Sequence, residues 1–119
     1  MSDLQFPDLN GFSLHVTVHI APENLEAFYA AMTPVFDAVA AEPECLYFEL
    51  YQDPTSPGTI SWVENWDATT QWFKDVQMQK DYYKPYFEAT IPMYIKDRQF
   101  RILKRLGPRY VVQKEANLK

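Results

Sequence analysis

The segment Trp62-Val63-Glu64-Asn65-Trp66-Asp67 places two indoles and a carboxylate at every second position. In a β-strand this spacing puts all three side chains on one face. Desolvation beside indoles raises the pKa of a carboxyl, which suits a base that removes a phenolic or C–H proton from a bound molecule. The competing interpretation of Glu64, which the sequence alone favours, is a structural ion pair with a C-terminal arginine. Asp67 is expected to end the strand as a helix N-cap.

Two histidines, His15 and His19, occupy a second strand pattern and share one face of it. At positions i and i+4 of a strand they lie about 13 Å apart, too far to bind one metal ion together. No further Cys or His completes a metal site. Either histidine could act as a general base if this face lines a pocket, but a hydrogen-bonded or interface role is preferred. Cys45, the single cysteine, is interpreted as a small buried apolar residue that excludes an intrachain disulfide.

The elements that must position these residues follow from hydrophobic periodicity. Alternation predicts four strands, and spacing at three and four residues predicts helices between them, the first of which Pro34 should bend or split. The strands are predicted at 12–20, 45–51, 59–66 and 98–106, and the helices at 21–39, 67–77 and 80–89, the last two as one helical region. The order β-α-β-β-α-β predicts an α+β, ferredoxin-like fold: a four-stranded antiparallel sheet with its helices on one face.

Length and composition limit the class of protein. The 119 residues suit one domain, here 12–106, with a leader at 1–11 and an extension at 107–119 as a possible dimer arm. A net charge of −5 argues against nucleic acid and anionic membranes as partners. Without a signal peptide or an apolar run of about 20 residues, the protein is expected to be soluble and cytoplasmic. The aromatic content of 16% indicates either an aromatic-lined cavity or an aromatic core.

A sheet covered by helices on one side only leaves its other face open, so a homodimer is expected. The charges are distributed unevenly: the second predicted strand region is acidic and the fourth is basic. These two strands are the predicted sheet edges, and their opposite charges could select the partner and its orientation. The charged residues concerned are Glu42, Glu44, Glu49, Asp53, Arg98, Arg101, Lys104 and Arg105.

The motif Glu42-Pro43-Glu44-Cys45-Leu46-Tyr47, followed after a hairpin by Glu64-Asn65-Trp66, resembles the antibiotic biosynthesis monooxygenase family. The usual family pattern has Gly where Glu44 stands. The resemblance covers roughly residues 12 to 106. It implies a dimeric α+β barrel with a pocket in each subunit, in which characterised members oxidise anthrones or quinols with molecular oxygen and without metal or flavin.

The family's functional residues carry over unevenly. Trp66 matches a pocket tryptophan shared by many members, and Trp62 stands where the anthrone-oxidising members have Asn. Trp72 stands where they have Tyr, their later Arg has no counterpart within 82–87, and no His follows His19, which argues against haem degradation through such a ligand. Tyr82, Tyr83 and Tyr86 have helical spacing and could cover the pocket.

Two functions remain open from the sequence. The first is a cofactor-independent monooxygenase that oxidises a small aromatic molecule of anthrone or quinol type, with Trp66, Glu64, His15 and His19 as catalytic candidates. Its substrate-binding candidates are Trp62, Trp72, Tyr82, Tyr83 and Tyr86. The alternative is a non-catalytic dimeric barrel protein that binds a small hydrophobic ligand, which the missing Asn, Arg and His favour.

Overall fold

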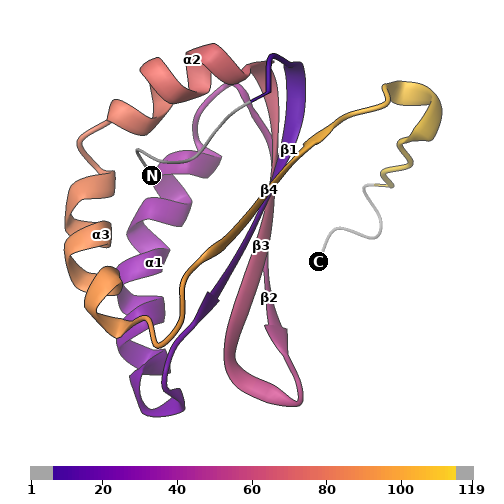
Figure 1. The fold of residues 1–119 in the computed structure, drawn as a ribbon. Coiled ribbons are helices and arrows are strands. Elements are labelled where there is room, and N and C mark those ends of the chain that lie inside the picture. Colours follow the sequence, from indigo (N-terminus) through magenta and orange to yellow (C-terminus); the bar gives the residue numbers. More distant parts are fainter. Residues whose placement is uncertain (1–6, 115–119) are drawn as a thin grey trace.

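The computed structural model describes residues 7–114 and has an α+β architecture. A four-stranded antiparallel sheet has the strand order β2-β3-β1-β4, and the helices lie together on one of its faces (Figure 1). The fold expected from the sequence is therefore confirmed, including β2 and β4 as the sheet edges. The strands are β1 (Asn10–His19), β2 (Cys45–Asp53), β3 (Ser56–Thr69) and β4 (Gln99–Lys104). The helices are α1 (Leu25–Ala40), α2 (Thr70–Asp75) and α3 (Tyr83–Thr90).

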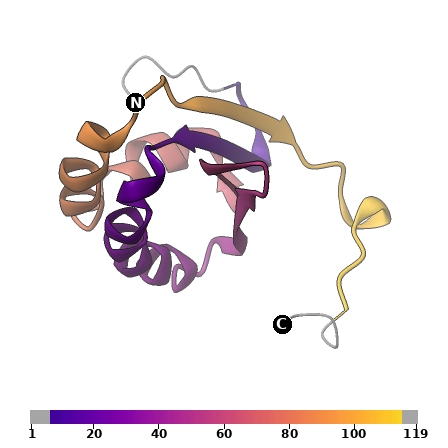
Figure 2. The ribbon, with the colours of Figure 1, turned by 90° about the horizontal axis from the view of Figure 1, so that it is seen from below.

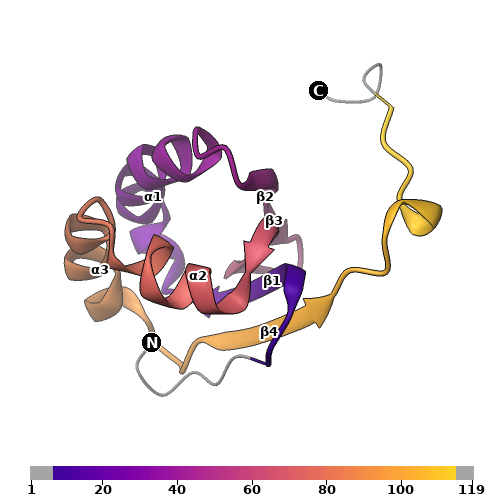
Figure 3. The ribbon, with the colours of Figure 1, turned by 90° about the horizontal axis from the view of Figure 1, so that it is seen from above.

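Alternation along β1 divides the molecule into a dry side and an open side. Leu14, Val16 and Val18 are buried against the helices, whereas His15 and His19 are half-buried on the opposite face. The buried stripe of α1 packs onto the dry face, and α2 and α3 complete the cover, so that sheet and helices form a ring in end view (Figures 2 and 3). The dry side therefore holds both the core and any enclosed site.

The end of β3 differs from the prediction. The strand continues through Asp67, whose N–H donates to the carbonyl of Glu44 at 2.8 Å, and ends at Thr69. The Thr69 hydroxyl accepts the N–H of Trp72 at 3.0 Å and caps α2. Asp67 is therefore not the helix N-cap, because pairing with the segment before β2 holds it in the strand.

Three other elements depart from the periodic pattern. Pro34 lies inside α1, which runs unbroken from Leu25 to Ala40, so the helix is not split. The register of β2 against β3 shifts between Cys45 and Tyr47, and this bulge turns Leu46 onto the open face, where it is exposed. The last strand ends at Lys104, before Leu106, which is also exposed.

The segment that follows β4 leaves the body of the molecule and extends on the open side of the sheet (Figure 1). Gly107 has a positive φ of 99°, and Tyr110, Val111 and Val112 beyond it are exposed. Residues 1–6 of the predicted leader and 115–119 of the predicted extension lie outside the described residues. Within the described range, no helix is both long and apolar enough to span a bilayer.

Gly58 is required where β3 meets the end of β1. The N–H of Ile20 donates to the Gly58 carbonyl at 2.8 Å, and a Cβ at Gly58 would lie 1.8 Å from the Ile20 carbonyl oxygen. We expect Gly58→Ala to lower the free energy of unfolding by about 2 kcal/mol or more, because the two backbones must separate. Urea unfolding measures it, with Ser56→Ala in the exposed hairpin as the control. Equal stability of the two variants would contradict this close approach.

Candidate active site

A cavity of about 50 Å³ lies between the dry face of the sheet and the helices. All four strands and all three helices contribute to its walls, which are mostly aromatic and aliphatic. Among the lining residues that the structure describes, Glu64 and Arg98 are the only charged ones. The volume is well below the roughly 300 Å³ of a small ligand pocket. A ring-containing ligand therefore enters only if wall side chains move.

Glu64 is the buried carboxylate of this cavity, with 7% of its surface exposed. The indole Nε1 of Trp62 donates to its Oε2 and that of Trp66 donates to its Oε1, each at 3.0 Å. Burial raises the pKa of Glu64 to about 7, and the two indole hydrogen bonds partly oppose this rise. The alternating pattern of 62–66 therefore places an acid with a near-neutral pKa against the cavity.

The ion pair that the sequence favoured for Glu64 is absent from the described residues: neither Lys nor Arg lies within 4.0 Å of its carboxylate. The sheet register explains the correction. Glu64 pairs across the ladder with Leu14, and Leu14 pairs with Ile102. Arg101, the residue directly before Ile102 in β4, therefore points to the opposite face of the sheet.

The three tryptophans have different positions. Trp62 lines the cavity and stacks on Phe28, with ring centroids 6.5 Å apart. Trp66 is fully buried and does not line the cavity. Its link to the site is the hydrogen bond that it donates to Glu64, which is a lining residue. Trp72 lies next to Trp66, at 6.2 Å between centroids, with the Lys80 ammonium 5.9 Å from its ring, and is not a lining residue.

The tyrosines at the N-cap and within α3 also have different positions. Tyr83 and Tyr86 line the cavity, and burial raises the pKa of both phenols, so they stay protonated and can donate hydrogen bonds. Tyr82 is not a lining residue. It donates to Glu42 at 2.8 Å, and burial, followed by this hydrogen bond, raises its pKa to about 12.

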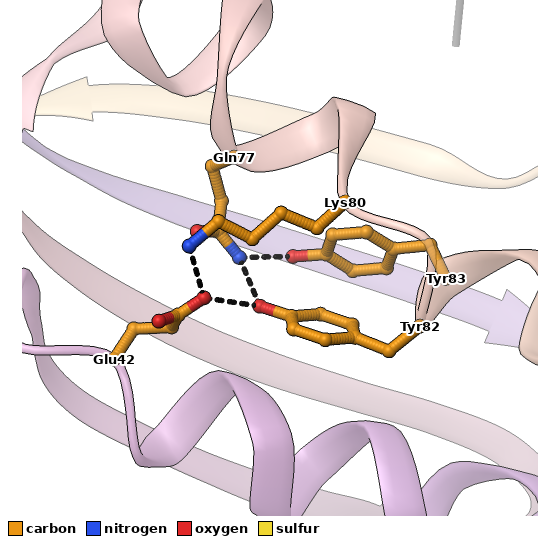
Figure 4. Close-up of polar contacts among 5 residues, drawn as sticks. All are labelled: Glu42, Gln77, Lys80, Tyr82 and Tyr83. Carbon is orange, nitrogen blue, oxygen red and sulfur yellow. Dashed lines mark hydrogen bonds and ion pairs between the residues drawn. The ribbon is translucent and has the colours of Figure 1, made fainter.

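A polar network ties the start of α3 to the turn after α1 (Figure 4). Gln77, fully buried, donates from Nε2 to the Tyr82 hydroxyl at 2.6 Å and to the Tyr83 hydroxyl at 2.9 Å. Glu42 accepts from Tyr82 and forms an ion pair with Lys80, whose hydrogen bond lowers the pKa of Glu42. The network therefore holds the hydroxyl of Tyr83, a residue that lines the cavity, on Gln77.

His15 and His19 lie on the open face, away from the cavity. His15 Nε2 is 2.9 Å from the Ser13 hydroxyl, and His19 Nδ1 is 3.1 Å from the Thr59 hydroxyl. Burial, and then the charge of Arg101, lowers the pKa of His15. Within this chain, the condition for a general-base role, a histidine face that lines the pocket, is not met.

Two residues, one in the cavity wall and one beside it, are not identified as site residues by the sequence interpretation. The sequence groups Arg98 only with the basic edge strand, whereas its guanidinium lies over three aromatic rings of the cavity wall. Gln77 gave no signal, since a single Gln in a helical region is usually a surface residue.

Cys45 is half-buried, and its pKa is raised to about 11 by burial and by Glu64, so the thiol stays protonated. No three potential ligands among His, Cys, Asp and Glu come together within residues 7–114.

The fold and the cavity define a class: a ferredoxin-like α+β domain with an aromatic pocket between sheet and helices. Comparison with known sequences then gives the family. The sequence profile of the antibiotic biosynthesis monooxygenase family matches residues 11–80. A protein of Pestalotiopsis microspora with a provisional monooxygenase name is 36% identical over 94 residues, which cover 79% of this chain and 78% of that protein. The chain belongs to the antibiotic biosynthesis monooxygenase family.

Solved structures agree on the fold. A structure from Caulobacter crescentus CB15, provisionally named an antibiotic biosynthesis monooxygenase, superimposes with a TM-score of 0.75 at 21% identity, over 83% of this chain and 92% of that one. One from Nitrosomonas europaea with the same provisional name gives 0.74 at 18% identity, over 88% and 98%. At these identities the likeness extends to the fold alone.

Proposed function

We propose that the protein is a cofactor-independent monooxygenase that oxidises a small aromatic substrate of anthrone or quinol type in the cavity between sheet and helices. The observation that carries the proposal is Glu64: a carboxylate with a pKa of about 7, enclosed by aromatic side chains and held by two indole donors. Family membership and the provisional name of the Pestalotiopsis microspora relative support the reaction class.

The chemistry asked of Glu64 is removal of one proton from the substrate. A general base works best when its pKa lies near the working pH, and a group with a pKa of about 7 is partly ionised there. Each Glu64 oxygen uses one lone pair for an indole N–H and retains another for the substrate proton. The indoles therefore orient the base without blocking it.

The electrons come from the substrate. For an anthrone, loss of the proton to Glu64 leaves an enolate that reduces molecular oxygen. The substrate CH₂ becomes C=O with one oxygen atom, and the other oxygen leaves as water with both hydrogens. Tyr83 and Tyr86 line the cavity with protonated hydroxyls, and these would donate to the anion by turning from their present partners Tyr82 and Tyr94. Apolar walls keep bulk water from the intermediate.

Oxygen uptake with a panel of anthrones and hydroquinones tests the proposal. The expected result is uptake that depends on enzyme and substrate, with formation of the carbonyl product and no hydrogen peroxide. Tight binding of the same molecules without uptake would favour the alternative, a non-catalytic protein that binds a small hydrophobic ligand. The observation that supports this alternative is the apolar lining of the cavity, which suits a hydrophobic ligand whether or not it reacts.

We also propose that a second copy of the chain covers the open face of the sheet. Between that face and the segment after β4 lies a hollow of about 490 Å³, lined partly by Leu46, Leu103 and Val112. The opposite charges of the two edge strands would set the orientation: Glu49 and Asp53 are exposed on β2, and Arg101 is exposed on β4. Glu42 does not contribute, because Lys80 already pairs with it.

Reversing the basic edge in the variant Arg101→Glu/Arg105→Glu is expected to weaken the dimer about tenfold or more, since attraction across the interface becomes repulsion. Sedimentation velocity in low and high salt measures this, because added salt screens such exposed charges. The matched control is Lys74→Glu/Lys84→Glu, with the same charge change on the exposed side of the helices. A dimer that responds to neither salt nor the Arg101/Arg105 reversal would refute the charge-selected pairing.

A further inference from the structure

Arg98 lies directly before β4 and is half-buried in an aromatic cage. Its guanidinium carbon is 5.7 Å from the ring centroid of Phe87, 5.6 Å from that of Tyr94 and 5.3 Å from that of Phe100. The faces of the rings attract a cation. They do not, however, accept hydrogen bonds from the five N–H groups that lie in the plane of the guanidinium. The cage positions the charge without satisfying its hydrogen bonds.

No acid within the described chain neutralises Arg98. The ion pairs formed by residues 7–114 are Lys80 with Glu42 and Lys84 with Asp81, and neither involves Arg98. Asp97, its neighbour in sequence, lies farther than 4.0 Å from the guanidinium, and no side-chain hydrogen bond from Arg98 is present in this part of the chain. A partly desolvated guanidinium with free donors is suited to bind an anion.

Arg98 is positioned so that a bound anion would lie next to the cavity that contains Glu64. Arg98 and Tyr94 line the inner cavity that holds Glu64, and both also line an outer hollow of about 370 Å³ that is open to solvent. Lys96 and Asp97 border the same hollow and leave its charge positive when Arg98 is counted. Arg98 thus lies where the cavity adjoins this hollow, a boundary that we call the mouth, with Glu64 inside.

We propose that Arg98 forms an anion subsite and that the substrate is an aromatic carboxylic acid. Its carboxylate binds the guanidinium at the mouth, its ring occupies the cavity after wall side chains have moved to enlarge it, and its ionisable C–H or O–H group faces Glu64. This inference rests on the proposed function for the orientation of the ring, but the subsite itself is defined by Arg98. The planar guanidinium presents two parallel N–H donors to a carboxylate, a match that neither an amide nor an ester reproduces.

Isothermal titration calorimetry with a matched pair of probes, 2-naphthoate and 2-naphthamide, tests the subsite without any turnover. The two molecules have the same ring and nearly the same shape, and only one carries a charge. Wild-type protein is expected to bind 2-naphthoate about tenfold or more tightly than 2-naphthamide. Arg98→Met should abolish this preference while changing the affinity for the amide less than about twofold, since the Met side chain retains contact with the rings.

Two further variants sharpen the test. Arg98→Lys keeps the charge but loses the paired donors, so part of the preference should remain, and this variant serves if Arg98→Met does not fold. Arg101→Met removes the same charge from the exposed open face and should leave the preference intact. Equal affinity of wild type for both probes, failure to bind either, or a preference retained in Arg98→Met would overturn the subsite.

The outcome is separable from that of the proposed function. Oxygen uptake with neutral hydroquinones and no carboxylate preference would reject the Arg98 subsite and keep the monooxygenase. A carboxylate preference lost in Arg98→Met, with no oxygen uptake for any aromatic acid, would keep the subsite and reject the monooxygenase.

Discussion

Glu64→Gln is expected to lower kcat/KM for oxygen uptake by about 10²- to 10⁴-fold, the usual contribution of a positioned general base. The amide keeps the shape of the side chain but cannot take the substrate proton. In wild type, activity should rise with pH through a midpoint near 7, because the ionised carboxylate is the active form. The residual activity of the variant should lack this midpoint. The matched control is Glu88→Gln, the same change at an exposed position of α3.

The same group gives a stability test that needs no substrate. The pKa of Glu64 rises from an ordinary 4.5 to about 7 on folding, so the folded state holds the proton more tightly. This contribution to stability is complete below about pH 4.5 and is lost as pH rises through 7, by roughly 3 kcal/mol in total. Urea unfolding of wild type should show this decline, and Glu64→Gln should not. A wild type with no decline between these pH values would contradict the buried acid.

The three tryptophans provide the second large effect, through one conservative change at three positions. Trp62→Phe and Trp66→Phe each remove one indole donor from Glu64, so both should move its pKa above 7. Trp66→Phe should also lower the free energy of unfolding by about 2 kcal/mol, since it opens space in a fully buried site and removes a hydrogen bond to a charged group.

Trp72→Phe is the control, because Trp72 packs beside Trp66 but makes no hydrogen bond to Glu64. Isotope-edited NMR of the glutamate carboxyls follows the titration directly and requires no substrate. The pKa of Glu64 is expected to shift upward in the Trp62 and Trp66 variants and to stay unchanged in the Trp72 variant. The same shift in all three, or in none, would show that burial alone sets the pKa.

Much of the fold was predictable because it depends on local periodicity. The alternation in β1 and around Trp62, Glu64 and Trp66 determines which side chains share a face, whatever the rest of the chain does. The helix N-cap was wrongly assigned to Asp67 instead of Thr69 for a nonlocal reason. The segment before β2 pairs with Asp67 and extends the strand past the residue that looked like a cap.

The interaction partners of the site residues were harder to predict from the sequence. The sequence showed an isolated acid and several arginines, and an ion pair followed from charge alone. The register sends Arg101 to the other face, and Arg98 lines the same cavity without forming an ion pair with Glu64, so that Glu64 is left with two indoles and a raised pKa. Gln77 illustrates the same limit: its two tyrosine partners lie on the adjoining turn and helix, and nothing in its local spacing marks it as buried.

By itself, the sequence predicted the order of strands and helices along the chain and the aromatic face that carries Glu64, because hydrophobic repeats decide these. The edge strands then followed from the ferredoxin-like order of elements. The tertiary structure alone decided that His15 and His19 face away from the cavity and that Arg98 stands at its mouth. It also decided that Glu64 has hydrogen-bond donors rather than a cation for partners. Those features depend on which face of the sheet the helices cover and on how β4 aligns with β1, and both are set by packing between segments distant in sequence.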